Sequence, residues 1–314
     1  MNELLSKAEK QKPKTEEVVH IPVLLQEVLQ YLNVKENGIY IDCTVGEGGH
    51  SGAILKILGD KGFLVGFDKD VKLLGIAEKR LSKIGKNFKL FNDDFSNFPS
   101  RLASLGIDKA DGIVFDFGIS SFQLENISRG FSFKKNGPLD MRFDSSSLLT
   151  CEKLVNESDY ESLYDILKNF GEERRASLIA RRIIQKRRQN RIKTTFQLAE
   201  IASKALGRGS GRIDPATRMF QAFRIAVNGE IESIEKILSQ VPNFLKGRGR
   251  VCAISYHSLE DRLVKWTFRA EKEKGTLKIL TKKPVRPSYE EVRGNPRSRS
   301  AKLRAAERTE FIPN

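Results

Sequence analysis

The chain has 314 residues, which is enough for a sizeable core and for either two domains or one domain with a large insertion. Hydrophobic residues make up 39% of it and charged residues 30%, which argues against wholesale disorder, and no apolar run approaches the roughly 20 residues of a membrane span. The excess of 55 Lys and Arg over 40 Asp and Glu gives a formal net charge of +15, which favours a polyanionic partner, with nucleic acid ahead of a membrane surface.

The N-terminal residues and the cysteines bear on the cellular compartment. Residues 1–17 mix both charges and lack the apolar stretch of a secretory signal, so we expect a mobile tail there. Three widely spaced cysteines form no Cys-x-x-Cys pair and predict neither a disulfide framework nor a zinc site: Cys43, Cys151 and Cys252. Because the chain also has only three histidines, the sequence predicts no bound metal and a protein of the reducing cytoplasm.

Residues 18–126 alternate between two kinds of hydrophobic pattern. The helical pattern is present over residues 20–32, 51–59, 71–84 and 96–105. Short β-branched or aromatic runs, typical of strands, lie at residues 38–45, 62–68, 88–95 and 111–118. Strands separated by short helices pair in parallel through right-handed crossovers, so we predict an open, doubly wound α/β sheet.

The alternation stops after residue 126. Residues 127–221 hold a glycine-containing polar loop followed by basic, mainly helical sequence, and strand character returns only at residues 249–258. We therefore predict a discontinuous sheet domain formed by residues 18–126 and 222–314, interrupted by an inserted helical domain over residues 127–221.

The segment DCTVGEGGHSG, residues 42–52, is a glycine-rich loop between a predicted strand and a predicted helix. No lysine follows the glycines, which excludes a phosphate-binding P-loop, and Ser51 occupies the place of the third glycine of a dinucleotide-binding motif. S-adenosylmethionine also needs close backbone approach, and Asp42 beside the turn could serve its ammonium group or hydroxyls. Asp68 ends the next strand, 20 residues after Gly48, where a carboxylate can accept both ribose hydroxyls of NAD or of S-adenosylmethionine.

Two basic segments are candidates for binding RNA. In residues 171–193, apolar side chains gather on one helical face, and three arginines recur opposite them at steps of seven: Arg174, Arg181 and Arg188. The only acidic residues in this segment are Glu172 and Glu173, expected in the first turn of the helix, whereas a solvated charged face normally alternates in sign. The C-terminal segment, residues 282–308, has a similar basic excess in a partly extended chain, and we expect backbone contacts to RNA from Arg297, Arg299 and Lys302.

Nine segments of the chain, in this order and spacing, resemble the small-subunit ribosomal RNA methyltransferase H family: HIPVLLQEVL, DCTVGEGGHS, GFDKD, DFGISSFQLE, RGFSFKKNGPLDMRFD, YDILKNFGEERRASLIARRI, DPATRMFQAFRIAVNGEI, ISYHSLEDRLVK and NPRSRSAKLRAAER. The resemblance covers residues from about 20 to about 308. It implies a Rossmann-like, S-adenosylmethionine-dependent methyltransferase with a doubly wound, mostly parallel sheet and an inserted helical domain. It also implies transfer of a methyl group to N4 of a cytidine in the decoding region of 16S ribosomal RNA within the small ribosomal subunit.

The resemblance also implies positions for the cofactor. Carried over residue by residue, they are Gly48, Gly49, His50, Asp68, Phe95, Asp116 and Gln123. One departure is Asp214, where members of the family often have histidine; an aspartate there is a good N-cap, which leaves a direct role of that histidine in doubt.

The chemistry suggests two further candidates. The cytosine amine is a poor nucleophile, so groups that hold its hydrogens and accept a proton would help, and Asp140 and His257 could do so. Against this, Asp140 could simply pair with Arg142, and His257 could be a packing residue at a strand end.

Other functions stay open from the residues alone. A non-catalytic ribosome-binding or RNA-binding factor needs no cofactor, and an NAD-dependent oxidoreductase would use Asp68 for NAD. We expect no membrane partner, and both a monomer and a homodimer stay open.

Overall fold

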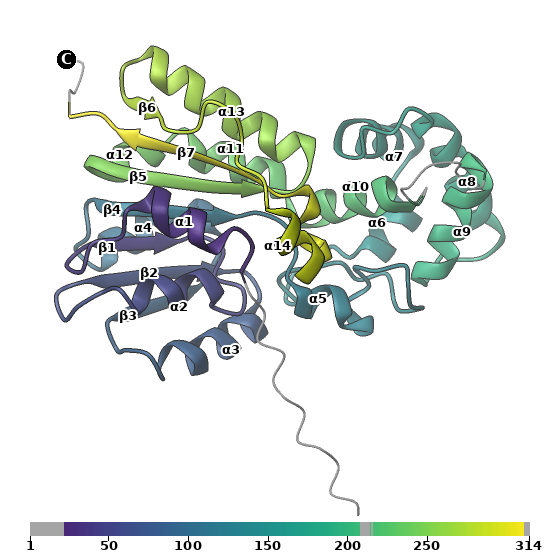
Figure 1. The fold of residues 1–314 in the computed structure, drawn as a ribbon. Helices are drawn as coiled ribbons and strands as arrows, with labels where there is room; N and C mark the ends of the chain where they lie inside the picture. The colour runs from purple at the N-terminus through teal and green to yellow at the C-terminus, as the bar shows by residue number, and fades with distance from the viewer. Residues whose placement is uncertain (1–21, 208–213, 215, 311–314) are drawn as a thin grey trace, which may run out of the picture.

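A mostly parallel sheet runs through the molecule (Figure 1). The computed structural model describes residues 22–207, 214 and 216–310, so the tail expected at residues 1–17 lies outside the described residues. Within this part of the chain the sheet has seven strands in the order β3-β2-β1-β4-β5-β7-β6. They are β1 (Ile39–Asp42), β2 (Phe63–Asp68), β3 (Phe88–Asn92), β4 (Ala110–Asp116), β5 (Leu245–Ser255), β6 (Leu277–Ile279) and β7 (Lys302–Arg308). β1 to β5 pair in parallel and β7 runs antiparallel to both β5 and β6, which confirms the predicted α/β fold class.

Helices cover both faces of this sheet (Figure 1). One face packs on α1 (Leu25–Leu32), α2 (Gly49–Leu55) and α3 (Val71–Leu81), and the other on α4 (Phe98–Ser104), α11 (Glu230–Leu238) and α13 (Ser258–Glu273). Successive strand residues alternate between the two cores: Tyr40 belongs to the first and Ile41 to the second. A sheet buried on both faces needs apolar side chains at almost every position, which is why its strands read as continuous hydrophobic runs.

Much of the chain between β4 and β5 forms a helical core of its own, beside the two cores of the sheet. It begins with α5 (Ser121–Glu125) and the short helix η2 (Ile127–Arg129) and continues with α6 (Cys151–Glu157), α7 (Tyr160–Asp165), the π-helix η3 (Ile166–Phe170), α8 (Ala176–Gln189), α9 (Thr195–Leu206) and α10 (Ala216–Asn228). The buried side chains of α6 to α10 pack on one another in a cluster separate from the two sheet cores. The predicted domain boundary at residue 221 falls inside α10, and α11 and α12 (Val241–Phe244) then lead back to the sheet.

The structure corrects one sequence-based expectation and makes another more specific. The helix α8 begins only at Ala176, because Glu172 adopts a positive φ of 46°, so Glu172, Glu173 and Arg174 precede the helix and do not form its first turn. The end of the C-terminal segment is extended, as expected, but its backbone is paired within the sheet, because Lys302 begins β7 between β5 and β6. The helix α14 (Tyr289–Gly294) and η4 (Pro296–Ser300) precede it.

Among the described residues, no helix is both long and apolar enough to cross a bilayer.

Candidate active site

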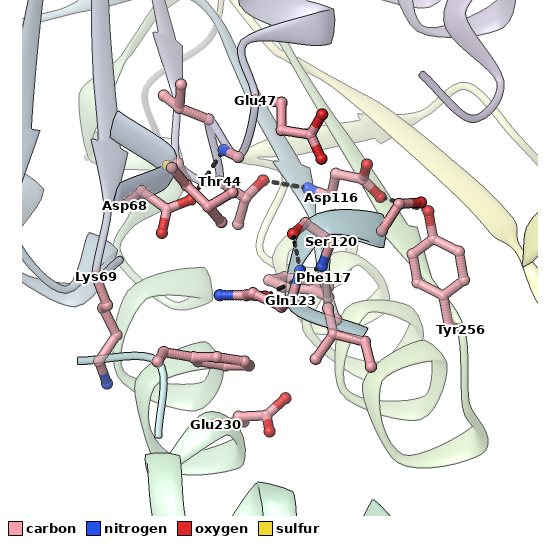
Figure 2. A pocket seen from close by; sticks show the side chains of 18 of the residues that line it. Thr44, Glu47, Asp68, Lys69, Asp116, Phe117, Ser120, Gln123, Glu230 and Tyr256 are labelled. Atoms are coloured by element: carbon pink, nitrogen blue, oxygen red, sulfur yellow. Dashed lines mark hydrogen bonds between the residues drawn. The ribbon is translucent and has the colours of Figure 1, made fainter. Parts of the chain in front are cut away.

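The strand ends of the parallel sheet meet at one cavity. β2 and β4 end in Asp68 and Asp116, and the strand order reverses between β1 and β4, which is where ligands bind in open α/β sheets. A cavity of about 490 Å³ opens at this edge. Its walls also include residues of α5, α10 and α11, so the helical part of the chain contributes to it (Figure 2).

The glycine loop bends through two residues with positive φ, Gly46 at 54° and Gly48 at 78°. A Cβ on Gly48 would lie 3.2 Å from the Cβ of Ala77, so Gly48 backs onto α3 and is not among the residues that line the cavity. Gly49 does line it, and a Cβ there would lie 2.4 Å from the Cγ of Pro22. The glycines therefore allow the turn and the close packing that bring the loop backbone to the cavity wall.

Asp68 is held by one backbone N–H of the glycine loop and by one from the turn that follows β2. Gly46 N–H donates to its Oδ2 at 2.8 Å and Asp70 N–H donates to its Oδ1 at 2.8 Å. Each carboxylate oxygen can accept a further hydrogen bond, and Asp68 lines the cavity. Burial raises the pKa of Asp68 to about 6. The site therefore holds a half-buried carboxylate with unused acceptor capacity, which suits a ligand with hydroxyl groups.

Asp116 lies two strands away at the end of β4. The hydroxyl of Tyr256 donates to its Oδ1 at 2.8 Å, and its own N–H donates to Thr44 Oγ1 at 2.6 Å. His50 Nε2 donates to the carbonyl of Val23 at 3.0 Å, which leaves Nδ1 facing Asp116 Oδ2 at 3.7 Å. Burial raises the pKa of Asp116 to about 6, against the opposing effects of His50 and Tyr256. Figure 2 shows Asp68 and Asp116 above the cavity and Glu230 below it.

Asp42, considered from the sequence as a ligand-binding residue, does not reach the cavity. It is buried and is absent from the cavity lining; its Oδ2 accepts the hydroxyl of Ser51 at 2.6 Å and its Oδ1 accepts Thr44 N–H at 3.1 Å. Burial also raises its pKa. Asp42 therefore ties the glycine loop to the start of α2.

Phe95 and Gln123 complete the side of the cavity nearest β3 and α5. The Phe95 ring meets Phe115 edge to face at 5.8 Å and leaves part of its surface to the cavity. Gln123 is 3% exposed; its Nε2 donates to Asp70 Oδ2 at 2.9 Å, and its Oε1 accepts Ser120 N–H at 3.1 Å. The structure thus brings six of the seven predicted cofactor positions to one cavity: Gly49, His50, Asp68, Phe95, Asp116 and Gln123.

The two candidates for proton transfer lie outside the cavity lining. Asp140 makes a two-pronged pair with Arg142, whose Nε and Nη2 each donate at 2.8 Å. Burial acts to raise the pKa of Asp140, but the hydrogen bonds from Arg142 outweigh it and hold that pKa below its usual value. His257 caps α13: its Nδ1 accepts Glu260 N–H at 3.4 Å, and its Nε2 lies 3.0 Å from Glu260 Oε1. Both side chains are engaged with neighbours in this state of the protein.

The candidate RNA-binding residues divide into two groups. Arg181 and Arg188 lie exposed on α8, with Arg174 exposed just before it. The other three lie near the C-terminus: Arg297 lines the cavity and pairs with Glu125 at 2.8 Å, Arg299 is exposed, and Lys302 lies 3.4 Å from Asp261.

A family model described as the MraW methylase family matches residues 17–309. The chain belongs to this family. It is 47% identical over 306 residues to the ribosomal RNA small subunit methyltransferase H of Halothermothrix orenii, with 92% of this chain and 98% of that protein covered. It is 46% identical over 312 residues to the protein of the same name from Maridesulfovibrio salexigens, with 93% and 96% covered. Among solved structures, fibrillarin from Aeropyrum pernix with bound S-adenosyl-L-methionine gives a TM-score of 0.40 at 11% identity, over 90% of this chain and 73% of that one.

Membership of the MraW methylase family confirms the resemblance drawn from the nine sequence segments and makes the chain a methyltransferase. In this family member Asp214 accepts Ala216 N–H at 2.8 Å and caps the start of α10, as expected; Pro215 lies outside the described residues. Over the residues that the structure describes, no group of three His, Cys, Asp or Glu side chains is placed to hold a metal ion.

Several residues at this cavity were not identified from the sequence. Tyr256 follows β5 directly, so the rule that ligands bind at strand ends would have pointed to it. Asn228 has no such signal: its Oδ1 accepts Phe143 N–H at 2.7 Å and its Nδ2 donates to the carbonyl of Met141 at 2.8 Å, 87 residues away in the chain. It holds Phe143 at the cavity wall. Lys69 links the sheet to the helical part of the chain, since its Nζ donates to Asp94 after β3 at 2.9 Å and to the carbonyl of Asn228 at the end of α10 at 3.0 Å.

Proposed function

We propose that this methyltransferase transfers the methyl group of S-adenosylmethionine to N4 of a cytidine in the decoding region of 16S ribosomal RNA, within the small ribosomal subunit in the cytoplasm. The observation that carries the cofactor part is the row of strand ends at the cavity, where Asp68 and Asp116 stand on either side of the glycine loop. The acceptor rests on the family and on the names of the relatives.

The residues fit this cofactor in the order of its parts. Phe95 after β3 offers an apolar face for adenine, Asp68 at the end of β2 can accept the ribose hydroxyls, and Asp116 at the end of β4 faces the methionine part. Three strand spacings separate β3 from β4, about 14 Å in all, which is comparable to the length of the extended molecule. The two half-buried carboxylates of Asp68 and Asp116 also favour a cation over a phosphate. A pyrophosphate would be repelled, which argues against the NAD-dependent oxidoreductase.

When bound, S-adenosylmethionine supplies a methyl group on a positively charged sulfur. The chain must then hold the amine in line with that methyl, near 3 Å, and keep water away. The cavity has walls from both the sheet and the helical part, including Phe143 and Asn228, so a base turned out of its stack can be enclosed there. Exposed arginines on and before α8 are available for the RNA backbone. A factor that only binds RNA would have no use for the carboxylates of Asp68 and Asp116 at the cavity.

The test is methylation of unmodified small ribosomal subunits by the purified protein with methyl-labelled S-adenosylmethionine. Nuclease digestion and mass identification of the labelled nucleoside should give N4-methylated cytidine from a single position. Label on another nucleoside would overturn the assigned acceptor. Failure to bind S-adenosylmethionine at all would overturn the cofactor assignment, and RNA binding without any transfer would favour the non-catalytic factor.

A further inference from the structure

Tyr256 reaches Asp116 across the junction of β4 and β5. It directly follows β5, and its ring lies against Gly118, where a Cβ would be only 3.3 Å from the ring carbon Cδ2. This close approach lets the phenol donate to Asp116 Oδ1 at 2.8 Å. Figure 2 shows the tyrosine on the opposite side of Asp116 from Asp68. The hydroxyl therefore binds Oδ1 and leaves Oδ2, which lies 3.7 Å from His50 Nδ1, without a hydrogen bond from the tyrosine, in a residue that lines the cavity.

The tyrosine is itself fixed in place. Its backbone N–H donates to Glu260 Oε2 at 2.7 Å, and Glu260 belongs to the capping box that begins α13. Burial raises the pKa of Tyr256 well above its usual value, so the phenol stays protonated and keeps its role as a donor. The end of β5 and the start of α13 thus hold Tyr256 so that its hydroxyl hydrogen points at Asp116.

The charged groups around Asp116 come from four elements. His50 on α2 and the Tyr256 hydroxyl after β5 favour the charged carboxylate, whereas Asp42 on β1 and Glu260 on α13 oppose it. Burial is the largest effect and raises the pKa of Asp116 to about 6. Removal of the tyrosine hydroxyl would take away one of the two groups that favour the charge, and the pKa would rise further toward neutral pH.

We propose that Tyr256 is a positioning residue whose hydroxyl keeps Asp116 charged and turned toward the cationic end of the cofactor. The inference rests on the proposed function, because it takes the cavity to be the site of S-adenosylmethionine. It gives a role to Tyr256, which lines the cavity but whose hydroxyl donates to Asp116, so that the hydroxyl acts on the cofactor through Asp116.

The test is calorimetric titration of S-adenosylmethionine into the full-length protein and into Tyr256→Phe between pH 5.5 and pH 8.5. The variant keeps the ring and loses only the hydroxyl. If the pKa of Asp116 rises by about one unit, the variant should bind about 5-fold more weakly than wild type at pH 6 and equally at pH 8. Equal weakening at every pH, or an unchanged pH midpoint, would overturn the proposal.

Two further variants separate the possible causes. Tyr40→Phe is the matched control: the Tyr40 hydroxyl is also buried and accepts Lys35 N–H at 2.8 Å, but it lies near the start of β1, and its pH profile should equal that of wild type. Asp116→Asn removes one of the two carboxylates, Asp68 and Asp116, whose protonation should weaken binding, so the log of the affinity should depend less steeply on pH. An unchanged slope of log affinity against pH would overturn the proposal even if Tyr256→Phe did not fold. Wild type that bound no S-adenosylmethionine at any pH would instead overturn the proposed function.

Discussion

Asp68 and Asp116, at the ends of the two strands that flank β1, lower the stability of the protein without a ligand. Both carboxylates are half-buried, and neither has a salt bridge to Lys or Arg among the residues that the structure describes. Burial raises the pKa of both to about 6. A cationic ligand with hydroxyl groups would offset this cost, because it brings the positive charge and the donors that the two carboxylates lack.

Replacement of Asp68 by alanine should weaken S-adenosylmethionine binding about 100-fold. The change removes two hydrogen bonds between a charged acceptor and the ribose hydroxyls, worth about 3 kcal/mol together. Calorimetry on Asp68→Ala checks this, with Asp108→Ala as the control because Asp108 is an exposed aspartate at the other end of β4. Affinity within a few-fold of wild type would remove the ribose role from Asp68.

The affinity for S-adenosylmethionine should fall about 100-fold from its plateau above pH 7 to pH 5. Both carboxylates must be charged to bind it, and each costs about tenfold one unit below its pKa of about 6. The effect on folding has the opposite sign: both groups bind protons more tightly in the folded chain, so their contribution to the free energy of unfolding is lost as the pH rises through 6. Thermal unfolding with and without the cofactor from pH 5 to pH 8 measures both trends. A constant cofactor-induced rise in Tm over that range would contradict this account.

The sequence allowed Asp68 to be proposed because its spacing from the glycine loop is set by one helix, α2, and one strand, β2. The prediction that Asp42 could bind the ligand was wrong, because residue spacing does not show which way its side chain points. A residue at a strand end can point along the strand toward the cavity or back beneath the loop, and the hydroxyl of Ser51 holds Asp42 beneath it. Gly48 likewise meets the local pattern but packs on Ala77.

At the scale of elements, α8 separates its charges from its core. Ile179 and Ile183 are buried, whereas Arg181 and Arg188 are exposed, and within the described part of the chain neither arginine has an ion-pair partner. Cations without a carboxylate nearby are available to phosphates at no cost in broken pairs.

Replacement of both Arg181 and Arg188 by alanine should weaken RNA binding and lower the slope of log affinity against log salt by about 1.5. The affinity for S-adenosylmethionine should not change, because neither residue lines the cavity. The control is Lys204→Ala on α9, where the lysine is exposed but already paired with Glu200 at 2.7 Å. Salt-dependent binding of 16S ribosomal RNA fragments measures the slope, and an equal slope in all three proteins would exclude α8 from the RNA interface.

The helices and strands of residues 18–126 were predictable because each has a hydrophobic period of its own. The strand β7 was not. Its sequence, KLRAAER, consists of residues that favour helices, and only its place between β5 and β6 makes it a strand. The long-range burial of Leu303, Ala305 and Ala306 overrides the local preference. No pattern within seven residues contains that information.

At the scale of the molecule, every predicted cofactor position precedes residue 124, yet the sheet that positions them is completed by strands after residue 244. β4 is a central strand and takes its second partner from β5. The cofactor site therefore depends on chain that supplies no predicted cofactor residue. The domain limits at residues 126 and 221 remain our proposal for how the two parts divide.

A chain that ends at residue 244 should neither unfold cooperatively nor bind S-adenosylmethionine, although it has all seven predicted cofactor positions. It lacks β5, β6 and β7, which leaves one side of β4 unpaired and removes Val251, Ala253 and Leu303 from the two cores. Circular dichroism during heating and calorimetry check both points. The matched control ends at residue 310, retains every strand, and should behave as wild type; cofactor binding by the shorter chain would refute this dependence.

The late arrival of β5 has a consequence for the newly made protein. About 130 residues separate the end of β4 from the start of its partner. At 5–20 residues per second, a ribosome needs roughly 6 to 26 s to make them. During that time the growing chain exposes a long apolar strand edge, of the kind that joins other chains and aggregates. A protein whose proposed substrate is the small ribosomal subunit therefore has an unpaired β4 edge during much of its own synthesis on a ribosome.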